Sequence, residues 1–153
     1  MVILAGAVAG LAGCGSSDPP ETPAACLAPM SAYLTALEAA PGQVRLAGAT
    51  PISDCLVEDQ AAGALQTVGK SLVDTASELN IQIRRRPDPE ASIQLGYLVG
   101  AVQQGAESTG GIHQDLVIRL DTAARYQPSN QASFSAAFER AYGEGYAAGQ
   151  ADG

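Results

Sequence analysis

The chain has no tryptophan, a single histidine and a single lysine among its eight basic residues. Nucleic-acid binding needs clustered lysine and arginine to displace counterions. A formal net charge of −8 with so few basic residues therefore argues against a nucleic-acid partner. Because zinc and iron sites draw on several histidine or cysteine ligands, the lone His113 leaves little to build a metal site from. We expect no metal and no cofactor.

No segment sustains the period-two alternation of apolar and polar residues that is typical of a half-buried strand. Apolar residues instead recur at spacings of three and four between proline, glycine and asparagine breaks. The pattern predicts an all-α domain over residues 26–153, a small bundle of four or five helices. The expected helices run from Leu27 to Leu37, from after Asp54 to Asn80, from Asp88 to Gly110-Gly111, from Ile112 to Pro128, and from near Ser129-Asn130 onward.

Several of these helices carry more specific predictions. Asp88-Pro89-Glu90 combines an N-cap carboxylate with proline at the first helical position, which is a strong helix start. The stretch from Ile93 to Val102 is apolar almost all round, so this helix should form the buried centre of the domain. Asn80 is expected to cap the C-terminus of the helix before it. The next helix is expected to turn inward Ile112, Leu116, Leu120 and Ala123.

A short apolar run, Val2 to Leu11, ends in Leu11-Ala12-Gly13-Cys14. The run is too short to span a bilayer, and an apolar stretch closed by small residues is typical of an export signal. With the cysteine at its end, the segment resembles the lipobox of bacterial lipoproteins. The resemblance implies that residues 1–13 are a signal peptide, that the Cys14 thiol receives a diacylglycerol, and that Cys14 becomes the mature N-terminus. It implies an extracytoplasmic protein anchored to the cell membrane.

The segments around Cys14 complete this interpretation. Residues 1–13 contain no lysine or arginine, although export signals open with positive charge, so we expect the true start to lie upstream and Met1 to be internal. Residues 14–25 are polar and rich in proline, and we expect them to form a disordered tether between the lipid and the domain.

Two cysteines remain once Cys14 is assigned to the anchor. In an oxidising compartment, Cys26 and Cys55 are expected to form a disulfide. A metal or redox role is the alternative, against which the two cysteines are far apart, lack a CxxC spacing and have no histidine beside them. Closing a loop of about 30 residues stabilises a fold by about 3.6 kcal/mol on the chain-entropy model.

The only run of like charges is Arg84-Arg85-Arg86. It is most simply a solvated helix end, and a contact with anionic headgroups is the alternative.

The last helix carries two ladders with a period of four. Small residues occupy Ser133, Ala137, Ala141, Gly145 and Gly149, and aromatic residues occupy Phe134, Phe138, Tyr142 and Tyr146. The central helix has a matching ladder at Ser92, Gly96 and Gly100. Small residues along this ridge favour close crossing of two helices, so we predict that the two helices pack backbone to backbone. The competing functional interpretation is a docking face for an envelope protein partner, formed by Tyr142, Gly145, Tyr146 and Gly149.

No catalytic motif supports an enzyme. Gly69-Lys70-Ser71 lies inside an amphipathic pattern and lacks the glycine spacing of a phosphate-binding loop. His113 is expected to be a surface residue in a first helical turn, and no serine has a nucleophile motif around it. We therefore expect a membrane-anchored envelope lipoprotein that serves as a helical interaction or structural module. The alternative is a binder of a small apolar or aromatic ligand in a cavity beside Tyr97 or Phe138.

Overall fold

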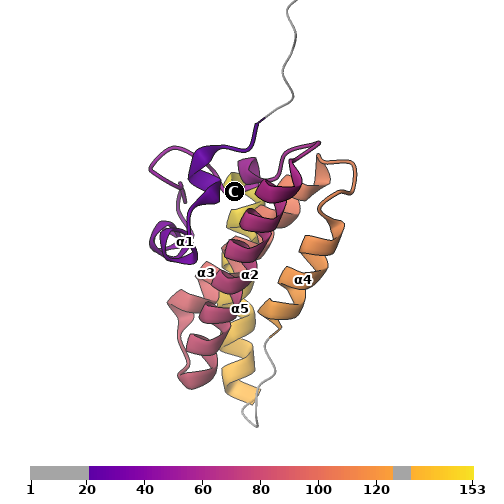
Figure 1. Ribbon diagram of the computed structural model, residues 1–153. Helices are drawn as coiled ribbons and strands as arrows, with labels where there is room; N and C mark the ends of the chain where they lie inside the picture. The colour runs from indigo at the N-terminus through magenta and orange to yellow at the C-terminus, as the bar shows by residue number, and fades with distance from the viewer. Residues whose placement is uncertain (1–20, 126–131) are drawn as a thin grey trace, which may run out of the picture.

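The computed structural model describes residues 21–125 and 132–153, with the side chains of the second range described from residue 136 (Figure 1). These residues form an all-α bundle, as the sequence predicts. The elements in chain order are η1 (Ala24–Leu27), α1 (Met30–Leu37), η2 (Ser53–Cys55), α2 (Ala62–Arg85), α3 (Pro89–Glu107), α4 (Gln114–Ala124) and α5 (Ala132–Asp152). The described residues contain no strand, only an isolated bridge between Leu46 and Thr50.

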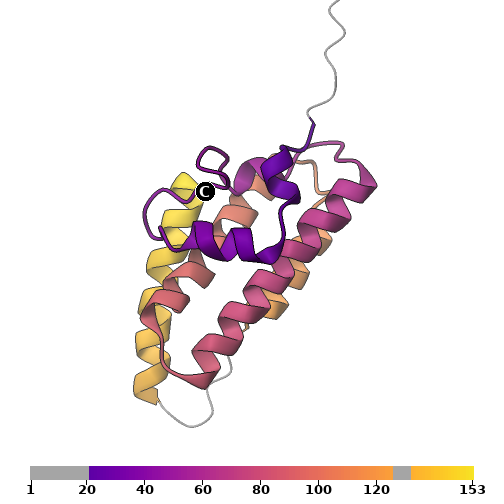
Figure 2. The ribbon, with the colours of Figure 1, turned by 60° about the vertical axis from the view of Figure 1, so that its left-hand side comes forward.

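The four long helices alternate in direction along one axis, and the short α1 lies across them (Figures 1 and 2). We call the end at which residue 21 enters the entry pole; it also holds η1, η2 and the end of α5. The opposite end, where α2 ends and α3 begins, is the far pole. At 1.5 Å per residue, the 24 residues of α2 span about 36 Å between the poles.

Helix α3 is the centre of the bundle, with α5 packed on one side and α2 and α4 on the other. Twelve of its 19 residues are buried, which is why its sequence is apolar almost all round. Its start is also as predicted: Asp88 Oδ1 accepts hydrogen bonds from the backbone N–H of Glu90 at 3.1 Å and of Ala91 at 3.3 Å.

The prediction that Asn80 caps its own helix is wrong. Helix α2 continues to Arg85, and Asn80 is buried in its interior. Its Nδ2 donates to the carbonyl oxygens of Ala123 at 2.7 Å and Arg125 at 3.0 Å, so it caps the C-terminus of α4. An asparagine that satisfies the backbone of a neighbouring helix does not need to end its own.

Three further expectations about helix starts are also wrong. The second helix, expected to open directly after Asp54, begins at Ala62, and residues 53–55 form the separate turn η2. Pro29 is the N-cap of α1, so Leu27 falls in the separate turn η1 and its side chain is 44% exposed. Ile112 precedes α4, which begins at Gln114, and Ile112 is 42% exposed rather than inward. The start of α5 expected near Ser129 and Asn130 lies outside the described residues.

The predicted disulfide joins Cys26 to Cys55 with an S–S distance of 2.02 Å. It links η1 to η2 at the entry pole, rather than the first turns of α1 and α2. The packed domain also begins before Cys26, because Gln60 Nε2 donates to Thr22 Oγ1 at 2.8 Å. The tether was expected to reach residue 25, but η1 already begins at Ala24.

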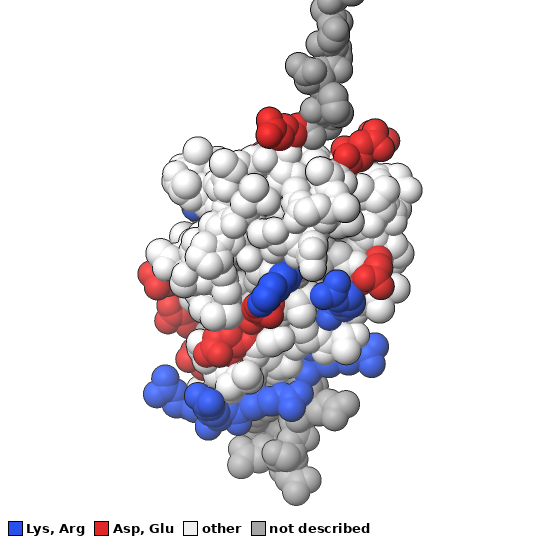
Figure 3. All heavy atoms as spheres, in the orientation of Figure 1, with Lys and Arg blue, Asp and Glu red and all other residues white. Residues whose placement is uncertain are grey.

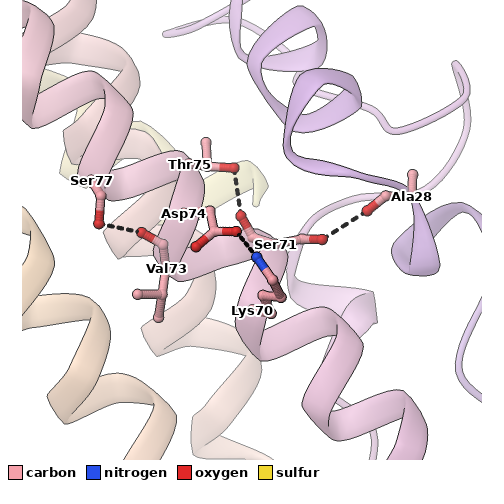
Figure 4. A network of polar contacts seen from close by, with 7 residues as sticks. All are labelled: Ala28, Lys70, Ser71, Val73, Asp74, Thr75 and Ser77. Carbon is pink, nitrogen blue, oxygen red and sulfur yellow. Dashed lines mark hydrogen bonds and ion pairs between the residues drawn. The ribbon is translucent and has the colours of Figure 1, made fainter.

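Polar side chains on the buried side of α2 are satisfied locally (Figure 4). Ser71 Oγ donates to the carbonyl oxygen of Ala28 at 2.9 Å and so ties α2 to the segment that leads into α1. Thr75 Oγ1 donates back to the Ser71 carbonyl at 2.6 Å. On the wet side, Lys70 forms an ion pair with Asp74 one turn later. Lys70 is thus a solvated helix residue.

Candidate functional site

The glycine ladders of α3 and α5 face each other. A Cβ atom built on Gly96 would collide with the backbone of Tyr142, and one built on Gly145 would collide with the carbonyl group of Ile93. Gly100 and Gly149 are closed in the same way by the backbones of Tyr146 and Tyr97. Only glycine allows the two helices to approach this closely, so the predicted backbone-to-backbone packing is confirmed.

The same packing corrects half of the candidate interaction face. Gly145 and Gly149 are buried against α3 and have no surface to offer to another protein. Helix α3 of the same chain covers this ladder, as the interpretation of ordinary core packing expects. The ladder's first rungs, the side chains of Ser133 and Phe134, lie outside the described residues.

Tyr142 and Tyr146 stay half-buried and continue an aromatic row that begins at Phe138. The ring centroids are 5.4 Å apart for Phe138 and Tyr142, and 6.3 Å apart for Tyr142 and Tyr146. The Tyr146 hydroxyl hydrogen-bonds to Gln103 Oε1 and accepts from Gln150 Nε2 at 3.0 Å. Tyr146 therefore joins α5 to α3 through Gln103.

Burial raises the pKa of Tyr142 to about 12, and the negative charge of Asp121 adds to the effect. Asp121 belongs to α4 and also accepts from Gln103 Nε2 at 3.4 Å. The tyrosine row is thus a polar edge of the α3, α4 and α5 packing. The Tyr142 hydroxyl remains protonated at physiological pH.

His113 is fully buried, so the expectation of a surface histidine is wrong. Its Nε2 lies 2.7 Å from Gln60 Oε1 and its Nδ1 lies 2.9 Å from Thr109 Oγ1. Gln60 Nε2 donates to Thr22 and, at 3.0 Å, to the carbonyl oxygen of Cys55. Since Gln60 presents its oxygen to the ring, His113 Nε2 carries the proton in the neutral form.

This network links parts of the chain that lie far apart in the sequence. Neither a carboxylate nor a serine is among the hydrogen-bond partners of His113, and burial lowers the pKa of its imidazole. The network instead joins the entry of the chain, the disulfide, the end of α3 and the start of α4. Sequence reasoning missed Gln60 and Thr109, because Gln60 meets the ring across 53 residues and carries no local signal.

The described cavities are open surface grooves. The groove between α1, α2 and α3 has a volume of about 560 Å³ and is lined by residues that include Leu34, Glu38 and Gln94. A groove of about 770 Å³ lies between α1 and the loop that follows it. None of the four described grooves is lined by Tyr97 or Phe138, the residues named for a ligand cavity. Both belong to the packed core.

Within residues 21–125 and 132–153, no three histidine, cysteine or acidic side chains gather as metal ligands would. None of the helices described there has the length and apolarity needed to cross a membrane. Cys14, the expected lipidation site, lies outside the described residues, as does the rest of residues 1–20.

The arginine triplet is exposed at the far pole, as the simpler interpretation predicts. Arg84 and Arg85 lie in the last turn of α2, and Arg86 is its C-cap. Arg125, the C-cap of α4, lies beside them, because Arg84 Nη2 donates to its carbonyl oxygen at 3.1 Å.

No protein-family model, no curated protein and no solved structure matches this chain.

Proposed function

We propose that this chain is a lipid-anchored extracytoplasmic protein whose helical domain serves as an envelope interaction module. The lipobox-like Leu11-Ala12-Gly13-Cys14 segment and the polar residues after it are the basis of the anchor. The single observation that carries the proposal is the pairing of the other two cysteines. Cys26 and Cys55 bond to each other, so neither needs another role, and Cys14 is the cysteine that the lipobox-like segment assigns to acylation.

The disulfide also supports the proposed compartment, since such bonds form and persist in oxidising surroundings outside the cytoplasm. The chain enters the domain at one pole, where Thr22 is bound by Gln60. An anchor at Cys14 would hold that pole toward the membrane and leave the far pole, about 36 Å away along α2, open to partners.

The proposed interaction surface does not include Gly145 and Gly149, because α3 covers them. A binder of a small apolar ligand is less well supported, because the described grooves are open and Tyr97 and Phe138 pack into the core. An enzyme is also less well supported, because the only histidine is held in a structural network.

Labelling with a fatty-acid analogue in the bacterial host tests the anchor. We expect the label on the wild-type chain and on a Ser16→Ala control, and none on Cys14→Ala. Equal labelling of Cys14→Ala would place the lipid elsewhere and would reject the proposed anchor. Absence of label from all three proteins would reject lipidation altogether.

A further inference from the structure

Half of the chain's eight basic residues lie at the far pole. They are Arg84, Arg85, Arg86 and Arg125, and all four are exposed. Figure 3 shows lysine and arginine side chains forming a band across the end of the molecule where α2 finishes. We call these four residues the arginine pole.

The fold holds the side chain of Arg84 and the backbone of Arg125 in place. Arg84 Nε donates to Asn80 Oδ1 at 3.1 Å and its Nη2 donates to the Arg125 carbonyl oxygen, also at 3.1 Å. Asn80 Nδ2 binds that same carbonyl oxygen at 3.0 Å. Of the five N–H groups of a guanidinium, Arg84 therefore keeps three for another partner. The ends of α2 and α4 are fixed side by side by one asparagine.

The charge of the arginine pole is only partly offset by its neighbours. Arg86 Nη2 lies 3.9 Å from Asp88 Oδ2, and Glu90 exposes a carboxylate in the first turn of α3. The guanidinium groups of Arg85 and Arg125 have no ion pair or hydrogen bond with any residue that the structure describes. The four arginines lie at the C-terminal ends of α2 and α4, where each helix dipole supplies about half a negative charge, so the dipoles offset only part of the four positive charges.

The acidic excess of the chain lies partly at the opposite end. Glu21, Asp54, Glu58, Asp59 and Glu107 are exposed around the entry pole. The poles are separated by about 36 Å, whereas the Debye length at physiological ionic strength is about 8 Å. The acidic entry pole therefore does not cancel the positive potential at the arginine pole.

We propose that the arginine pole binds an extended polyanion, a polymer with repeated phosphate or carboxylate groups. A guanidinium group can donate two parallel hydrogen bonds to a phosphate group or to a carboxylate group. The four arginines line none of the described grooves, so the site is open and suits several weak contacts along a chain. A single small anion would find no enclosure here.

The placement of this polymer rests on the proposed lipid anchor. The seven residue steps from Cys14 to Glu21 span at most about 25 Å, which is less than the length of α2. The domain cannot stand on its far pole upon the membrane that holds its own lipid. A domain that stands upright on this tether presents the arginine pole to a polymer beyond the headgroups.

Calorimetric titration of the full-length chain carrying Cys14→Ala tests the proposal, with long-chain polyphosphate and poly-glutamate as probes. We expect binding to at least one polymer that weakens with added salt. Adding Arg85→Gln and Arg125→Gln should weaken it about 25-fold, at about fivefold for each arginine near an anionic array. The matched control, Lys70→Gln with Arg119→Gln, removes the same charge from the middle of the bundle and should change binding less than twofold.

Absence of binding to both polymers, or equal weakening by both double variants in folded protein, would overturn the proposal. Arginine-dependent binding to vesicles that contain phosphatidylglycerol, with none to either polymer, would replace it by a headgroup contact. Unlipidated Cys14 together with intact polymer binding would leave the anion site in place and reject only its position relative to the membrane. Thermal unfolding of each variant shows that the comparison is between folded proteins.

Discussion

Two fully buried tyrosines differ in whether their hydroxyl groups have a partner. The Tyr33 hydroxyl donates to the carbonyl oxygen of Cys26 at 2.7 Å, beside the disulfide, and burial raises its pKa. The Tyr97 hydroxyl lies near the Val44 backbone and the Arg45 guanidinium, but it makes no hydrogen bond of normal geometry among the described residues. A buried polar group without a partner costs free energy, whereas a bonded one contributes about 1 kcal/mol.

Removal of each hydroxyl should therefore have a different effect. We expect Tyr33→Phe to lower the free energy of unfolding by about 1–2 kcal/mol, because the Cys26 carbonyl loses its donor. Tyr97→Phe should leave it unchanged or raise it by up to about 1 kcal/mol. Denaturant unfolding of the oxidised proteins measures both, and each variant is the control for the other. Equal losses of unfolding free energy in the two variants would contradict this difference between the two hydroxyl groups.

His113 gives the fold a dependence on pH. Since burial lowers the pKa of the imidazole, the unfolded chain binds a proton more readily than the folded chain. Stability is then fully present above the unfolded pKa of about 6.5 and is lost as the pH falls below it.

We expect the free energy of unfolding to fall between pH 7.5 and pH 5.5, by at most about 1.4 kcal/mol for each pH unit below 6.5. A His113→Gln variant removes the only histidine, so the dependence over this range should flatten. Denaturant midpoints at a series of pH values provide the measurement. An equal slope in the variant would assign the effect to another group.

At the scale of the helix, the seam between α3 and α5 depends on glycine. Gly145 and Gly143 belong to the same helix, but Gly145 meets the carbonyl group of Ile93, whereas Gly143 has nothing within 4 Å of an added Cβ. An alanine at the first position must push the helices apart. An alanine at position 143 meets nothing and only improves helix propensity.

We therefore expect Gly145→Ala to lower the free energy of unfolding by about 2–4 kcal/mol, as overpacking in a tight core does. Gly143→Ala should raise it by about 0.5–1 kcal/mol. Thermal and denaturant unfolding of the pair measure the difference. If Gly145→Ala were as stable as the wild type, α5 would not be held on α3 through this seam.

Local and periodic signals explain which elements the sequence predicts well. The start of α3 is readable because Asp88, Pro89 and Glu90 act within one turn, and the α3–α5 contact is readable because both ladders repeat every four residues. Asn80 and His113 were misassigned because their partners come from other parts of the chain, 43 and 53 residues away. A polar residue shows its chemistry in the sequence, but its burial depends on tertiary packing.

At the scale of the whole molecule, the two ends of the bundle differ in chemistry. The entry pole holds the disulfide and the His113 network, and the end of α5 is fixed there by a hydrogen bond from Arg45 to the Asp152 carbonyl oxygen at 2.9 Å. The far pole carries the four exposed arginines of the arginine pole. In the proposed arrangement, the stapled end is held at the membrane and the basic end is presented outward.

The most direct test of this arrangement is mass spectrometry of the N-terminal peptide of the mature protein, isolated from the membrane fraction of the native host. The account predicts a peptide that begins at Cys14, lacks residues 1–13 and carries the mass of a diacylglycerol on the cysteine thiol. A chain that retains residues 1–13 with a free Cys14 thiol would contradict the anchor and the orientation that follows from it.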